Sequence, residues 1–159
     1  MLKVLAHSVC VITITISTAA ANSPPQKAAF DTESLRVTLD DRGQVSGLFD
    51  KANGKQYAQL DHPSPLLQVW RENSLRTADR MEWDNERGLL TFHYGPARAV
   101  VQATVKPAYI TLELIAVESS DSVERVQWGP IATRIATNVG ETIGVVRDEE
   151  FTIGLQVLN

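Results

Sequence analysis

Residues 99–117 read AVVQATVKPAYITLELIAV, and this stretch decides the fold. Apolar side chains occupy the even positions of residues 110–116, which is the period of two that sends successive side chains to opposite faces of a strand. Lys106-Pro107 interrupts the run. The stretch therefore predicts two long strands, residues 99–105 and 109–117, joined by a turn.

The same alternation continues on both sides of this pair, with turn residues about every ten positions. Asn53-Gly54 is a strong hairpin signal, because both residue types tolerate positive φ. No window carries an apolar stripe of helical period. Residues 71–85 predict a loop followed by a strand. Further strands are predicted at residues 35–39, 45–49, 57–60, 66–70, 89–94, 123–128, 131–137, 142–146 and 151–158.

About ten short strands separated by turns predict an all-β protein, an antiparallel β-sandwich with a β-barrel as the alternative. The chain has 159 residues, of which 43% are hydrophobic, so one domain accounts for it. Its predicted limits are residues 34–159. Residues 22–33 contain Pro24-Pro25 and no sustained apolar period, which predicts a short extended linker.

Residues 1–21 have the features of a secretory signal peptide. Lys3 supplies the positive start, residues 4–16 the apolar stretch, and Ala19-Ala20-Ala21 the small residues of a cleavage site. We expect cleavage before Asn22 and a secreted or periplasmic product that has no membrane association after the signal is removed.

Charge and cysteine content exclude several classes of function. Fifteen Lys and Arg against nineteen Asp and Glu give a formal net charge of −4 without a basic stripe, which argues against nucleic-acid binding. The one cysteine, Cys10, lies in the signal segment, so no disulfide framework is predicted. His62 and His93 match no metal-ligand spacing. We therefore predict neither a metal nor a cofactor.

Acidic residues gather at residues 79–86 and at residues 148–150, where a catalytic pair of carboxylates would be sought first. Both groups lie in polar turns, and no apolar pocket is evident that would raise the pKa of a general acid. The motifs of nucleophilic hydrolases and phosphate-binding loops are missing as well. No catalytic residue is assigned to this chain.

Trp70, Trp83 and Trp128 each neighbour polar or charged residues. A tryptophan ring beside hydrogen-bonding side chains can stack on the C–H face of a sugar. Trp83 and Trp128 are therefore the predicted carbohydrate-binding residues. Burial in the core of the sandwich is the alternative interpretation for each ring, because tryptophan is usually well buried.

Two parts of the chain resemble carbohydrate-active proteins. Residues 34–57, SLRVTLDDRGQVSGLFDKANGKQY, resemble the opening of a galactose-mutarotase-like supersandwich. The segments QWGPI (127–131), GETIGVVRD (140–148) and FTIGLQVLN (151–159) resemble the N-terminal region of large secreted bacterial polysaccharide-degrading enzymes. The resemblance implies a sandwich that precedes a catalytic domain, and it carries over no catalytic residue.

The resemblance implies a noncatalytic, carbohydrate-associated module of a glycoside hydrolase or polysaccharide lyase, with a polysaccharide or oligosaccharide as ligand. Residues 151–158 form a strongly apolar strand without a closing turn. We therefore expect a chain truncated at its C-terminus, with a missing C-terminal catalytic domain as partner. The alternative is a stand-alone exported binding or adhesion domain unrelated to enzymes.

Overall fold

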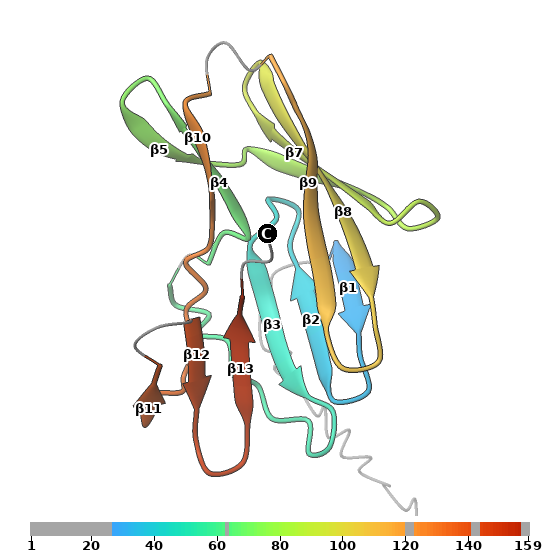
Figure 1. The fold of residues 1–159 in the computed structure, drawn as a ribbon, viewed down its shortest axis with the longest axis vertical. Coiled ribbons are helices and arrows are strands. Elements are labelled where there is room, and N and C mark those ends of the chain that lie inside the picture. The colour runs from blue at the N-terminus through green and yellow to red at the C-terminus, as the bar shows by residue number, and fades with distance from the viewer. Residues whose placement is uncertain (1–26, 63, 120–122, 141–143, 157–159) are drawn as a thin grey trace, which may run out of the picture.

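The computed structural model describes residues 27–62, 64–119, 123–140 and 144–156. All regular structure in these ranges is β-strand, arranged as four antiparallel sheets (Figure 1). Each sheet is open, since its first and last strands do not pair with each other. The prediction of an all-β, antiparallel sandwich is confirmed, and the alternative of a closed β-barrel is excluded. The predicted signal peptide lies outside the described residues.

The first sheet has the order β1-β2-β3 and contains β1 (Ala28–Asp31), β2 (Leu35–Leu39) and β3 (Val45–Asp50). The turn between β2 and β3 depends on Gly43, whose φ is 71°. A Cβ at this position would lie 2.3 Å from Cε1 of Phe92. Glycine is required here both for its backbone conformation and for the close approach of a core ring.

The predicted linker over residues 22–33 is wrong where β1 forms. Ala28 and Phe30 are buried in the core, and Phe30 is only 3% exposed. Two buried residues in a four-residue strand are too short a pattern to distinguish from a loop by period alone. Pairing with β2 supplies the missing information, because it fixes Phe30 opposite Val37. Residues 22–26 lie outside the described ranges.

The largest sheet has the order β6-β7-β8-β9. It contains β6 (Arg80–Asp84), β7 (Leu89–Tyr94), β8 (Ala97–Val105) and β9 (Ile110–Glu118). The long hairpin β8–β9 confirms the predicted pair of long strands (Figure 1). A register shift between Val100 and Val101 interrupts the alternation of β9, because Leu114 pairs with the buried Val101 whereas Ala116 pairs with Val100 on the other face.

A third sheet has the order β10-β4-β5, with β10 (Arg125–Trp128), β4 (Leu67–Arg71) and β5 (Ser74–Thr77). Strand β5 falls where only a loop was predicted. The hairpin between β4 and β5 turns through Glu72 and Asn73, both at positive φ. Glutamate is an unusual residue for that conformation, so the turn has no clear sequence signal.

The fourth sheet, β11-β12-β13, contains β11 (Asn138–Val139), β12 (Gly144–Arg147) and β13 (Thr152–Leu155). Strand β13 lies within the strand predicted at residues 151–158, and β12 overlaps the strand predicted at residues 142–146 but ends one residue later. Strand β11 replaces a predicted turn, because its two residues pair with the end of β12.

The strands predicted at residues 57–60 and 131–137 do not form. The two segments share one isolated bridge, Ala58 to Thr133. The side chain of Gln56 explains the first case, since its Oε1 accepts from the amides of Leu48 (2.7 Å) and Ala58 (2.9 Å). A side-chain acceptor thus replaces the backbone partners that a regular ladder would use.

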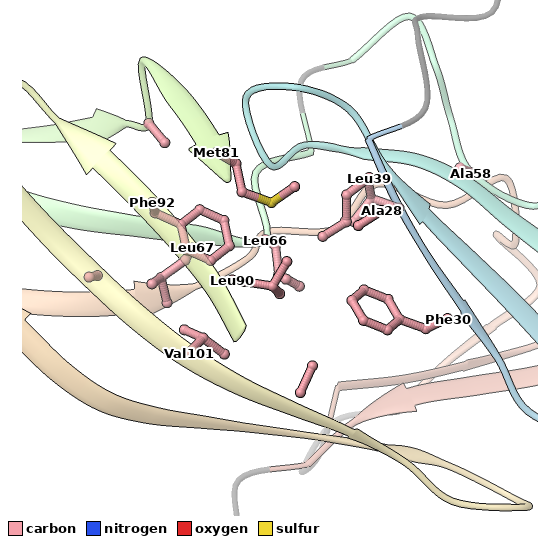
Figure 2. Packing of buried hydrophobic residues seen from close by; sticks show 14 of the residues in the cluster. Ala28, Phe30, Leu39, Ala58, Leu66, Leu67, Met81, Leu90, Phe92 and Val101 are labelled. Carbon is pink, nitrogen blue, oxygen red and sulfur yellow. The ribbon is translucent and has the colours of Figure 1, made fainter. Parts of the chain in front are cut away.

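The core lies between the first sheet and the β6–β9 sheet, with β4 closing one end. Side chains from these elements point toward one another in Figure 2. The hydroxyl of Tyr94 donates to the carbonyl of Leu67 at 2.9 Å and ties β7 to β4. Burial raises the pKa of Tyr94. Central members of the cluster are Ala28, Phe30, Leu39, Leu66, Leu67, Met81, Leu90, Phe92 and Val101.

Candidate functional site

Trp83 lies on β6 with its ring turned toward the core. Its strand partner is the fully buried Leu90, so both side chains share the inner face of the sheet. The indole meets the ring of Phe30 edge to face, with centroids 5.1 Å apart. Trp83 is partly buried and packs against the hydrophobic cluster. Carbohydrate binding by this ring stays a prediction.

Trp128 lies on β10 and, like Trp83 on β6, has a buried strand partner. It pairs with the buried Leu67 of β4, which places its side chain on the inner face of the third sheet. It too is partly buried and packs against the cluster. Carbohydrate binding by Trp128 stays a prediction.

Trp70 differs from the other two tryptophans. Val69, the residue before it on β4, is 1% exposed and faces the core, so Trp70 projects from the outer face. Its cross-strand partners are Arg125 of β10 and Leu75 of β5. The Cζ atom of Arg125 lies 4.4 Å from the centroid of the indole. Trp70 is therefore the outward-facing tryptophan among the three.

A row of polar side chains runs beside Trp70 on the same face. Gln68 of β4 pairs with Gln127 of β10 and with Thr77 of β5. Gln127 and Thr77 are exposed, whereas Gln68 is buried between them. This outer face combines a partly exposed aromatic ring with amide, hydroxyl and guanidinium groups.

A hollow of about 220 Å³ lies beside the β2–β3 turn. Its second wall is the segment around Asp61 and His62, whose Oδ1 and Nδ1 atoms are 3.3 Å apart. The contact with His62 holds the pKa of Asp61 below its ordinary value, so this carboxylate is ionised near neutral pH. The full lining is Asp40, Gln44, Val45, Ser46, Leu60, Asp61 and His62.

A larger and more open hollow, of about 700 Å³, shares Leu60 and Asp61 with the first. Leu60 is 42% exposed, so an apolar side chain stands in both hollows. The other lining residues carry amide, hydroxyl and guanidinium groups together with one methyl group. They are Gln59, Thr133, Arg134 and Ala136.

Backbone hydrogen bonds hold the two walls of the larger hollow together. The amide of Gln59 donates to Ala132 O at 3.1 Å, and the amide of Arg134 donates to Tyr57 O at 2.8 Å. The buried Ser64 adds its Oγ, which accepts from the Ala132 amide at 3.0 Å. Two segments far apart in the sequence thus form one site.

The first group of acidic residues serves the turns of the β6–β9 sheet. Asp79 accepts from the amide of Gly95 at 2.7 Å. Asp84 accepts from the amides of Glu86 and Arg87, both at 3.1 Å. These bonds satisfy backbone donors that the turns leave unpaired. Asp79 and Asp84 thus fit the interpretation of residues 79–86 as a solvated turn, whereas Glu82 lies within strand β6 and not in a turn.

Asp148 does the same in the β12–β13 turn, where it accepts from the amides of Phe151 (2.7 Å) and Glu150 (3.0 Å). The Phe151 amide is the main cause of the lowered pKa of Asp148. The pKa of Glu82 is also lowered, chiefly by its hydrogen bond with Arg80. A general acid needs the opposite shift, because it must keep its proton near neutral pH.

His93 lies on the outer face of β7 and is 8% exposed. Its Nδ1 is 3.2 Å from Nη2 of Arg80, and its Nε2 is 3.2 Å from Oε1 of Glu82. Arg98 of β8 is its other cross-strand partner. The imidazole of His93 thus lies between the side chains of Arg80 and Glu82. Within the described ranges, no group of three or more His, Cys, Asp or Glu is placed to hold a metal ion.

No family model, curated protein or solved structure matches this chain. The resemblance of residues 34–57 and of the C-terminal segments to polysaccharide-degrading proteins therefore stays a prediction. In the part of the chain that the structure describes, no helix is long and apolar enough to cross a membrane.

Sequence reasoning missed the two hollows. The sequence places Asp61 and His62 in a loop directly after the strand predicted at residues 57–60, and Arg134 within the strand predicted at residues 131–137. Their association depends on the pairing of residues 57–59 with residues 132–134, which is set by tertiary structure. The cluster Asp-His-Pro-Ser-Pro at residues 61–65 was the one local signal, since such polar loops often carry functional side chains.

Proposed function

We propose that this chain is a noncatalytic, carbohydrate-associated β-sandwich, the N-terminal module of a secreted glycoside hydrolase or polysaccharide lyase. The observation that carries the proposal is the pair of hollows that share Leu60 and Asp61. The resemblance of residues 34–57 to a mutarotase-like supersandwich agrees with it. The ligand is a polysaccharide or an oligosaccharide.

The chemistry of the hollows suits a sugar. An ionised Asp61 accepts hydrogen bonds from sugar hydroxyls, and the guanidinium of Arg134 donates to them. The amides of Gln44 and Gln59 can do both. Leu60 offers an apolar contact for the C–H groups of a pyranose ring. A concave surface with a few convergent polar groups is the usual form of a small-ligand site.

Three carboxylates support the noncatalytic part of the proposal. Asp61, Glu82 and Asp148 all have lowered pKa values, so each favours the ionised form. Glycoside hydrolysis requires one carboxylic acid with a raised pKa beside a second carboxylate. The proposal assigns catalysis to a separate domain.

Glycan binding by the purified protein tests this function. Isothermal titration with a panel of neutral and acidic oligosaccharides should identify at least one ligand. Asp61→Ala and Arg134→Ala should each weaken its binding by about tenfold or more, the loss expected when a charge-assisted hydrogen bond is removed. Glu113→Ala, on the exposed face of β9, is the matched control and should leave the affinity unchanged.

Absence of binding to every member of the panel would contradict the proposal. It would favour the alternative, an exported adhesion domain that recognises something other than a glycan. Turnover of a polysaccharide that is abolished by one Asp or Glu substitution would contradict the noncatalytic part alone.

Export is the remaining part of the proposal, and the signal features of residues 1–21 support it. Mass spectrometry of protein recovered from the periplasm or the medium should find Asn22 as the first residue. A cytoplasmic product that keeps Met1 would contradict export.

A further inference from the structure

We propose that Arg125, held on the ring of Trp70, anchors a negatively charged group of a saccharide on the outer face of the β10-β4-β5 sheet. The group is a carboxylate of a uronic acid or a sulfate ester. This inference rests on the proposed carbohydrate association and extends it, because it names an acidic ligand and a second contact surface.

The contact with the Trp70 ring orients the guanidinium of Arg125 before a ligand binds. Arg125 and Trp70 are direct cross-strand partners, and the Arg125 Cζ lies 4.4 Å from the indole centroid. An arginine that contacts an aromatic face loses less side-chain freedom when it then binds an anion. Its N–H donors form a rigid fork that matches the spacing of carboxylate and sulfate oxygens.

The positive charge of Arg125 can also interact with a ligand. In the described ranges, no carboxylate lies within ion-pair distance of Arg125. Arg71 and Arg76 on the neighbouring strands differ from it, because both contact Glu72, at 3.1 and 3.7 Å. A guanidinium that has no carboxylate partner among the described residues, on a protein of net negative charge, attracts an anion in preference to a neutral ligand.

The adjacent row of cross-strand residues supplies polar groups that can bind the rest of the sugar. Gln127 and Thr77 are exposed on either side of Gln68, one row along the sheet from Trp70. Rows on one face of a sheet are about 7 Å apart, so a monosaccharide bound at Arg125 reaches the side chain of Gln127. The amide can then bond to its hydroxyl groups.

Titration with three oligosaccharides of equal length tests the inference: a polygalacturonate fragment, a sulfated galactan fragment and a neutral galactan fragment. We expect the wild-type protein to bind at least one acidic fragment more tightly than the neutral one. Arg125→Gln should weaken the acidic binding by about tenfold or more, and it should leave neutral binding unchanged. Which acidic fragment binds identifies the source of the charge.

Two further variants keep the test independent of folding. Arg125→Lys keeps the charge but removes the fork, so we expect a smaller loss than with Arg125→Gln at an unchanged melting temperature. Arg36→Gln, an exposed arginine on β2, is the matched control and should change nothing. Acidic binding should also weaken as the salt concentration rises.

The outcomes separate this inference from the proposed function. Binding of the neutral fragment alone, or acidic binding that Arg125→Gln leaves intact, would overturn the acidic anchor while the carbohydrate association stands. Binding of none of the fragments would overturn the anchor, and failure across the broader glycan panel would overturn the association as well.

Discussion

The segment from Ala28 to Ala103 and the segment after Val123 are built from strands of similar character, yet they are held in different ways. In the described residues, every fully buried hydrophobic side chain lies between Ala28 and Ala103, with the exception of Ile135. The later strands β10, β12 and β13 contribute partly buried side chains that pack around this core. Alternation in a sequence therefore specifies strands without specifying how deeply they are buried.

The β12–β13 hairpin of the later region packs on Tyr57, a buried residue of the earlier region. Phe151 stacks on the ring of Tyr57, with centroids 4.6 Å apart and an angle of 12° between the planes. Lys55 contacts Glu150 at 2.8 Å and lies over the Tyr57 ring. Exposed ion pairs of this kind add little stability. The stacked rings thus hold the β12–β13 hairpin in place.

The largest expected effect is in the earlier region. Phe92→Ala should destabilise the protein by about 3–5 kcal/mol, because it leaves a cavity where the ring is fully buried and contacts the β2–β3 turn. Denaturant unfolding measures this change. Ile115→Ala is the control, since that side chain is 50% exposed and its removal should have little effect. Equal losses in the two variants would contradict the position of the core.

A smaller effect is expected from Phe151→Ala. Loss of the stacked pair should cost about 1 kcal/mol and should act on the hairpin rather than on the whole domain. Hydrogen exchange at the amides of β12 and β13 should become faster, while exchange at Val101 stays unchanged. Phe151→Tyr should restore the protection. A uniform increase in exchange across all sheets would show that the two regions unfold as one unit.

Acidification should produce the smallest effect. The pKa of Asp148 is lower in the folded protein, so its contribution is complete above the unfolded value and is lost as the pH falls through the folded value. The amide resonance of Phe151, which donates to Asp148, should move with a midpoint below about 3.9. Asp148→Asn should remove this transition. A midpoint at or above that value would contradict the hydrogen-bonded turn.

The fold was predictable to the extent that local alternation determines it. Residues 99–117 predicted the β8–β9 hairpin correctly, because nine-residue strands give a clear period of two. Strand β1 was assigned to the linker because four residues give no such signal. Residues 57–60 were assigned to a strand because the competing acceptor, the side chain of Gln56, is outside the segment and gives no periodic pattern.

The candidate sites were less predictable, because they depend on which face of a sheet a residue occupies. Trp83 and Trp128, like Trp70, have polar or charged neighbours in the sequence, but strand pairing places the first two beside core residues. Only the register of β10-β4-β5 distinguishes Trp70 from them. The hollow that joins Asp61 to Arg134 needs the contact between residues 57–59 and residues 132–134, which no local pattern encodes.

Both proposed contact surfaces use side chains of the later region on the scaffold of the earlier one. Chemical-shift mapping of the isotopically labelled protein with an acidic oligosaccharide tests this arrangement most directly. We expect saturable shifts at Trp70 and residues 125–127, and at Gln59–His62 with residues 133–136, while the resonances of the core amides of β7 and β8 do not shift. Shifts confined to the edge around Trp83, or no saturable shift with any glycan, would contradict this arrangement.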